Sequence, residues 1–139
     1  MARGLFGLAL CACVAVVSGC GDSGPKRPPA TTVEGTVQLD GAPLEEGEIS
    51  LMVEGQPDMR LPIKAGKFSG NALSGDNTVR IYAYKTTEPI MMNGTPVGDP
   101  VKVNIIAEEY NDKSTLKEKV AGGGAKGLKY EVKKKLDAK

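Results

Sequence analysis

Apolar and polar residues alternate with a period of two along most of this chain, and turn-forming residues interrupt the alternation at short intervals. In residues 33–39, the apolar Val33, Val37 and Leu39 fall on one face, and polar residues fall on the other. Asp40-Gly41, a frequent turn pair, follows directly. This pattern is typical of half-buried β-strands joined by tight turns.

The same pattern recurs along the chain and indicates the fold class. We find no convincing amphipathic helix, although residues 108–120 are ambiguous. Pro62 cannot donate a backbone hydrogen bond and therefore predicts an edge strand where it occurs. Seven or eight short strands predict an all-β fold, an antiparallel β-sandwich occupying residues 33–139. The further alternating runs are residues 49–53, 59–63, 79–83, 101–105, 116–120 and 128–136.

The last of these runs has one face rich in lysine. Leu128, Tyr130, Val132 and Leu136 share the apolar face, and the other face is charged through residues 129–135. Charges of this kind suit an exposed edge strand, because they block edge-to-edge pairing. The alternative is a basic patch that faces an anionic membrane.

The first twenty residues follow the plan of a secretory signal. One positive charge, Arg3, precedes an apolar run from Gly4 to Val17, and the small residues Ser18 and Gly19 stand directly before Cys20. A membrane span needs roughly 20 apolar residues, and this run holds only about 14, which suits a cleaved signal. We therefore expect a signal peptide over residues 1–19.

The end of this segment resembles the lipobox of bacterial lipoproteins: an aliphatic residue, two small residues and a cysteine. The resemblance implies cleavage between Gly19 and Cys20, lipidation of Cys20, and residues 20–32 as a flexible tether rich in Gly, Pro and Thr. A rival match at residues 10–13 leaves a shorter apolar run. The chain is then exported and held on a membrane by acyl chains on Cys20, in the periplasm or at the cell surface.

Composition narrows the possible functions. The chain has 18 basic and 17 acidic residues, and removal of Arg3 leaves 17 of each. A neutral mature chain argues against a nucleic-acid partner, which needs a basic surface. There is no histidine, and Cys11 and Cys13 leave with the signal, so the usual nucleophile and general base are missing. We therefore expect a protein that is not an enzyme and has no cofactor or metal.

Residues 35–47 resemble the opening of the carboxypeptidase regulatory-like family, which has a transthyretin-like (prealbumin-type) β-sandwich. The matching features are the alternating strand with Gly35 and Val37, the Asp-Gly-Ala-Pro-Leu turn at residues 40–44, and Gly66-Lys67-Phe68. Residues 110–116 also resemble a segment of small bacterial lipoproteins that carry this domain. The resemblance implies an accessory module without catalytic residues. Ile63-Lys64 departs from the family's Thr-Asp pair and puts any cation site of that turn in doubt.

Residues 86–100 form an unusually long connection for a small sandwich. Asn93-Gly94 predicts a tight turn at its tip, and Ile90, Met91 and Met92 precede the turn. Methionine adapts well to contact surfaces, so these three residues are candidates for a binding surface. The alternative is that they cap one end of the core.

Arg80, Tyr82 and Tyr84 are the other candidates, because they share the face opposite Val79 and Ile81. If the valine face is the core, the tyrosines form an exposed aromatic shelf for sugars or peptides. The alternative is that the tyrosines pack beneath a loop. The expected function is thus an envelope lipoprotein with a non-catalytic module for protein or glycan binding. A structural spacer without a ligand is the alternative, and a hydrolase with an unmarked site is a third.

Overall fold

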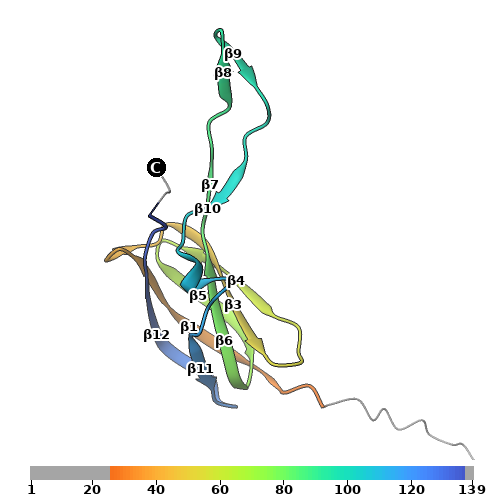
Figure 1. The fold of residues 1–139 in the computed structure, drawn as a ribbon. Coiled ribbons are helices and arrows are strands. Elements are labelled where there is room, and N and C mark those ends of the chain that lie inside the picture. Colours follow the sequence, from red (N-terminus) through yellow and green to blue (C-terminus); the bar gives the residue numbers. More distant parts are fainter. Residues whose placement is uncertain (1–25, 137–139) are drawn as a thin grey trace, which may run out of the picture.

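The computed structural model describes residues 26–136 and confirms an all-β, sandwich-like fold. A single long sheet curls around one core, and a narrow arm projects from its end (Figure 1). The sheet contains β1 (Ala30–Leu39), β2 (Ala42–Pro43), β3 (Glu46–Val53), β4 (Met59–Lys64), β5 (Lys67–Leu73), β6 (Gly75–Tyr82), β11 (Lys117–Val120) and β12 (Ala125–Val132). The arm contains β7 (Tyr84–Thr86), β8 (Ile90–Met92), β9 (Thr95–Val97) and β10 (Lys102–Asn104), and the 3₁₀ helix η1 (Glu108–Tyr110) follows.

The strand order of the sheet is β11-β6-β3-β4-β5-β1-β12, with β2 paired to the end of β1. All neighbouring strands of this sheet pair antiparallel except β1 and β12, which run parallel to each other. The inward positions of the strands meet in one apolar core. Fully buried side chains at its centre include Val33, Val37, Ile49, Leu51, Val79, Ile81 and Val132.

The first strand begins earlier than its alternation predicts. β1 starts at Ala30 rather than Val33, and residues 30–32 pair with residues 71–73 of β5. The expected tether therefore ends before Ala30. Thr31 and Thr32 are both polar and do not show the alternation of apolar and polar residues that indicates a strand. They are part of β1 because they pair with β5.

The prediction of an edge strand at Pro62 is wrong, because β4 lies inside the sheet between β3 and β5. Pro62 is opposite Glu48 of β3. β4 pairs with β5 only at Ile63 and Lys64, so Pro62 lies outside the β4–β5 ladder. Proline is tolerated here because no donor is required, although the strand as a whole is internal.

β12 confirms the edge-strand interpretation of the lysine-rich run. It is the last strand of the sheet, with Lys129 and Glu131 exposed and Val132 buried. The predicted strand was too long, however. β12 ends at Val132, and Leu136, which we grouped with the apolar face, is fully exposed.

Candidate functional site

The arm spans residues 84–104 and includes the long connection of residues 86–100. β7 and β10 pair at its base, and β8 and β9 pair at its tip. Asn93 and Gly94 join β8 to β9 with φ angles of 51° and 78°, as the Asn-Gly pair predicts for a two-residue hairpin turn. Figure 1 shows the arm extending well beyond the curled sheet.

The tip of the arm is apolar and open to solvent. Ile90, Met91 and Met92 have exposed fractions of 72%, 62% and 60%. The alternative that these residues cap the core is therefore wrong. No residue from Pro89 to Gly98 carries a charge. Exposed apolar patches on small proteins commonly mark contact surfaces, and this is the most prominent one in the described part of the chain.

Tyr82 and Tyr84 form a stacked pair where the arm leaves the sheet. Their ring centroids are 6.3 Å apart and their planes differ by 2°. Tyr84 is 55% exposed, whereas the Tyr82 hydroxyl donates a hydrogen bond to Asp112, at 3.2 Å. Burial, followed by this contact, raises the pKa of Tyr82. The shelf is thus half open: Tyr82 packs toward the loop after η1, and Tyr84 faces solvent.

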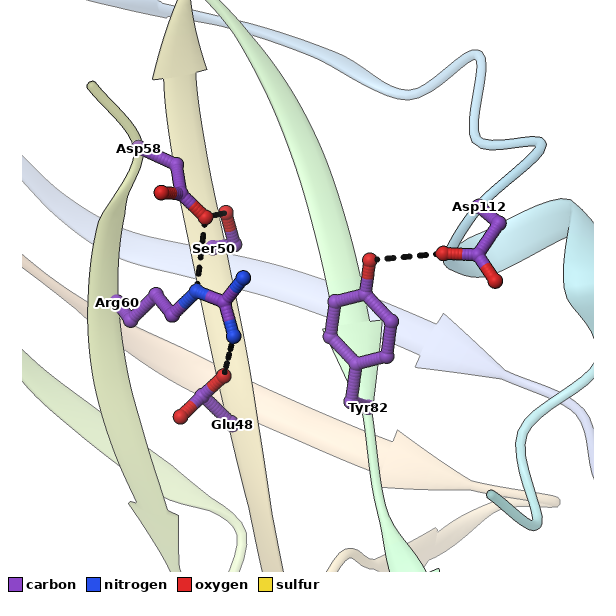
Figure 2. A network of polar contacts seen from close by, with 6 residues as sticks. All are labelled: Glu48, Ser50, Asp58, Arg60, Tyr82 and Asp112. Atoms are coloured by element: carbon purple, nitrogen blue, oxygen red, sulfur yellow. Dashed lines mark hydrogen bonds and ion pairs between the residues drawn. The ribbon is translucent and has the colours of Figure 1, made fainter. Parts of the chain in front are cut away.

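A polar network that the sequence did not reveal lies on the same outer face of the sheet (Figure 2). Arg60 contacts Asp58 at 2.8 Å through Nε and Glu48 at 3.1 Å through Nη1. Ser50 donates to Asp58 at 3.2 Å and is almost fully buried beneath the network. The hydrogen bond from Arg60 is the main cause that lowers the pKa of Asp58.

Arg80 lies beside this network on β6, two residues before Tyr82. It lies opposite Ser50 in the register between β3 and β6. Its Nε is buried and has no hydrogen-bond partner among residues 26–136. Arg80, Tyr82 and Tyr84 therefore belong to one face, as the alternation predicted.

A shallow hollow of about 370 Å³ lies at the base of the arm. Tyr84 and Thr86 line it from β7, and Lys102 lines it from β10. Glu48 and Lys64 contribute a carboxylate and an ammonium group from the sheet. An exposed aromatic ring beside groups of both charges can hold a polar ligand with apolar faces, such as a sugar.

The predictions about the lipid anchor, metal binding and a membrane span concern other parts of the chain. Gly19 and Cys20, the expected cleavage and lipidation residues, fall outside the described residues, so both stay predictions. Within residues 26–136, no group of three or more acidic, His or Cys side chains is placed to hold a metal ion. That part of the chain also has no helix long and apolar enough to cross a membrane.

Comparison with known proteins does not assign this chain to a family. No family model matches the chain, and no curated protein is similar in sequence. One solved structure is similar, that of a DUF3823 family protein from Parabacteroides merdae, with 17% identity and a TM-score of 0.37. The alignment covers 76% of this chain but only 46% of that protein. A match this distant assigns neither a family nor a function.

Proposed function

We propose that this chain is an exported, membrane-anchored envelope lipoprotein whose β-sandwich module binds other molecules without catalysis. The observation that carries the proposal is the arm, with an uncharged, apolar tip that is 60–72% exposed at Ile90, Met91 and Met92. A side chain of this kind gains about 1.5–3 kcal/mol when it is fully buried, so its exposure has a cost that a partner would remove.

The arrangement of the molecule supports this function. The described residues begin at Lys26. The start of their ribbon, drawn in orange, lies at one end of the molecule, and the arm projects at the other (Figure 1). A lipid on Cys20 would therefore hold the end where β1 begins near the membrane and present the arm to the envelope space. The transthyretin-like, carboxypeptidase regulatory-like resemblance agrees with an accessory module of this kind.

The stacked Tyr82 and Tyr84 favour glycan as a second class of ligand. Tyr84 is 55% exposed and borders the hollow at the base of the arm. Tyr84→Ala would remove the open ring, whereas Tyr84→Phe keeps it. If a glycan binds here, its affinity falls with the alanine variant and is largely retained with phenylalanine.

Two other functions compete with this proposal. A structural spacer needs no ligand, and a hydrolase needs a nucleophile that no motif marks. A photoreactive residue at position 91, installed in the native envelope, separates the spacer from the binding module. Specific adducts that are absent with the same group at Gln38, an exposed position on β1, favour a binding module. Equal, diffuse labelling at both positions favours the spacer.

The lipid anchor is tested by intact mass and membrane fractionation of the native protein beside Cys20→Ser. We expect a mature chain that begins at acylated Cys20, and a variant that is released or left unprocessed. An unmodified Cys20 with unchanged fractionation contradicts the anchor. The chain would then be a secreted or otherwise anchored sandwich.

A further inference from the structure

The unpaired strand edges of this protein differ in how well they are protected. An exposed edge offers free N–H and C=O groups to another strand, and natural proteins block it with charge or proline. In residues 26–136, every strand with an unpaired edge contains such a residue except β8, whose sequence is Ile90-Met91-Met92. The protecting residues are Pro43 on β2, Lys85 on β7, Pro96 on β9, Lys102 on β10, Lys117 on β11 and Lys129 on β12.

The two edges of the arm tip are chemically unequal. Met92 and Thr95 close the two-residue turn and Met91 is opposite Pro96. In an antiparallel ribbon, the pair next to the closing pair directs its backbone groups outward. Met91 therefore offers both its N–H and its C=O to the outside of β8. Pro96, at the same level of β9, has no N–H to offer.

We propose that β8 is a self-association edge, which pairs antiparallel with β8 of a second copy of this chain about a twofold axis beside Met91. The two Met91 residues exchange backbone hydrogen bonds, and the arm tips join into a four-stranded sheet in the order β9-β8-β8-β9. This inference goes beyond the proposed function and does not depend on the lipid anchor. A twofold interface uses the same patch on both copies, and β8 meets that condition.

The side chains suit this arrangement. With Met91 opposite Met91, Ile90 of one copy lies opposite Met92 of the other, and the reverse pair forms as well. Cross-strand apolar pairs stabilise a sheet, whereas like charges opposite each other oppose it. Glu88, the nearest charged residue before β8, would lie opposite Gly94 of the other copy, so no like charges meet.

The arm itself also gains from the pairing. A two-stranded ribbon is marginally stable alone in water, and three or more strands with an apolar face are usually needed. β8 and β9 have three residues each, and Ile90, Met91, Met92 and Val97 are all exposed. Pairing turns two marginal ribbons into one sheet and covers the edge that lacks protection.

The test is disulfide trapping of the full-length, processed protein with Met91→Cys and, as the matched control, Pro96→Cys. Directly opposite residues that exchange hydrogen bonds have Cα atoms about 5.5 Å apart, within disulfide range. The two positions 96 would be three strand spacings apart, about 14 Å, which is too far. We expect a disulfide dimer with Met91→Cys and only the wild-type background with Pro96→Cys. Equal trapping of both variants overturns the proposal, because it indicates random collision.

A second measurement covers the case in which no disulfide forms. The molar mass of the wild-type protein is followed by light scattering over a concentration series, beside Met91→Pro and Met91→Ala. Proline copies the protection found at Pro96, whereas alanine keeps the N–H. We expect a dimer that Met91→Pro weakens at least tenfold and Met91→Ala weakens less. A wild-type monomer at every concentration, or equal weakening by both variants, overturns the proposal.

Discussion

The curled sheet, or body, and the arm show the same alternation of apolar and polar residues, but their apolar side chains differ in exposure to solvent. Ile49, Leu51 and Ile81 of the sheet are fully buried, whereas Ile90 and Met92 of the arm are mostly exposed. The sheet curls so that its inner face closes on itself, but no other strand of the described residues lies opposite the arm (Figure 1). An alternating pattern thus indicates a strand, and burial depends on whether a second layer exists.

The comparison extends to the strand edges. The sheet ends in β11 and β12, which carry several charges, and these charges keep other strands away. At the tip of the arm, the edge strand β8 carries none. The two end strands of the curled sheet are therefore protected by charge, whereas the β8 edge of the arm is not.

The largest expected difference is in the cost of removing an apolar side chain. Leu51→Ala should lower the free energy of unfolding by about 2–5 kcal/mol, because it opens a cavity in the core. Met92→Ala should change it by less than about 0.5 kcal/mol, because the side chain is mostly exposed. Urea denaturation of both variants measures the difference. Similar losses would show that the arm packs against the body in solution.

The next largest loss of stability is expected where the backbone at Gly35 packs closely against neighbouring residues of the sheet. A Cβ atom at Gly35 would lie 2.6 Å from the ring of Phe68, so Gly35→Ala should cost about 1–3 kcal/mol through overpacking. Gly122→Ala is the control, because nothing lies within 4 Å of a Cβ atom there. Thermal melts should separate the two variants clearly. Equal melting temperatures would contradict the tight β1–β5–β12 packing.

A smaller effect depends on pH and again separates body from arm. Burial, then the charge and hydrogen bond of Glu118, raises the pKa of Tyr130 well above its usual range. The folded state therefore keeps the hydroxyl proton more tightly than the unfolded state does. The resulting stability is complete below the ordinary tyrosine pKa of about 10 and is lost progressively as the pH rises above it.

This effect is measured by denaturation from pH 7 to pH 11. Tyr130→Phe should lose about 0.5–1.5 kcal/mol at neutral pH with the hydrogen bond to Glu118, and its stability should fall less steeply in alkali. Tyr84→Phe on the exposed shelf is the control. An unchanged alkaline slope in Tyr130→Phe would contradict the burial of this hydroxyl.

The smallest expected effect is that of removing the arm tip. Replacement of residues 90–97 by a short glycine turn should leave the free energy of unfolding unchanged within about 0.5 kcal/mol. Chemical denaturation beside the wild type tests this. A large loss would mean that the arm stabilises the body, and the contrast between the two regions would fail.

The sequence predicted what is local and missed what depends on distant pairing. Residues 33–39 and 79–83 show their buried faces directly through alternation, and Asn93-Gly94 predicted the turn of the arm. The internal position of β4 and the parallel pairing of β12 with β1 are set by partners far along the chain. The same holds for the candidate site: Arg80, Tyr82 and Tyr84 share a face by parity, but Asp58, Arg60 and Asp112 reach it only through register.

The position of β1 between β5 and β12 has a mechanical consequence. Its hydrogen bonds run to β5 along residues 30–36 and to β12 along residues 33–39. If the predicted tether pulled on Ala30 while a partner held the arm, the load would act on these bonds along the strand direction. They must then slide together, as in shear, instead of opening one at a time like a zipper. The strand nearest the predicted anchor is thus the one best arranged to bear tension.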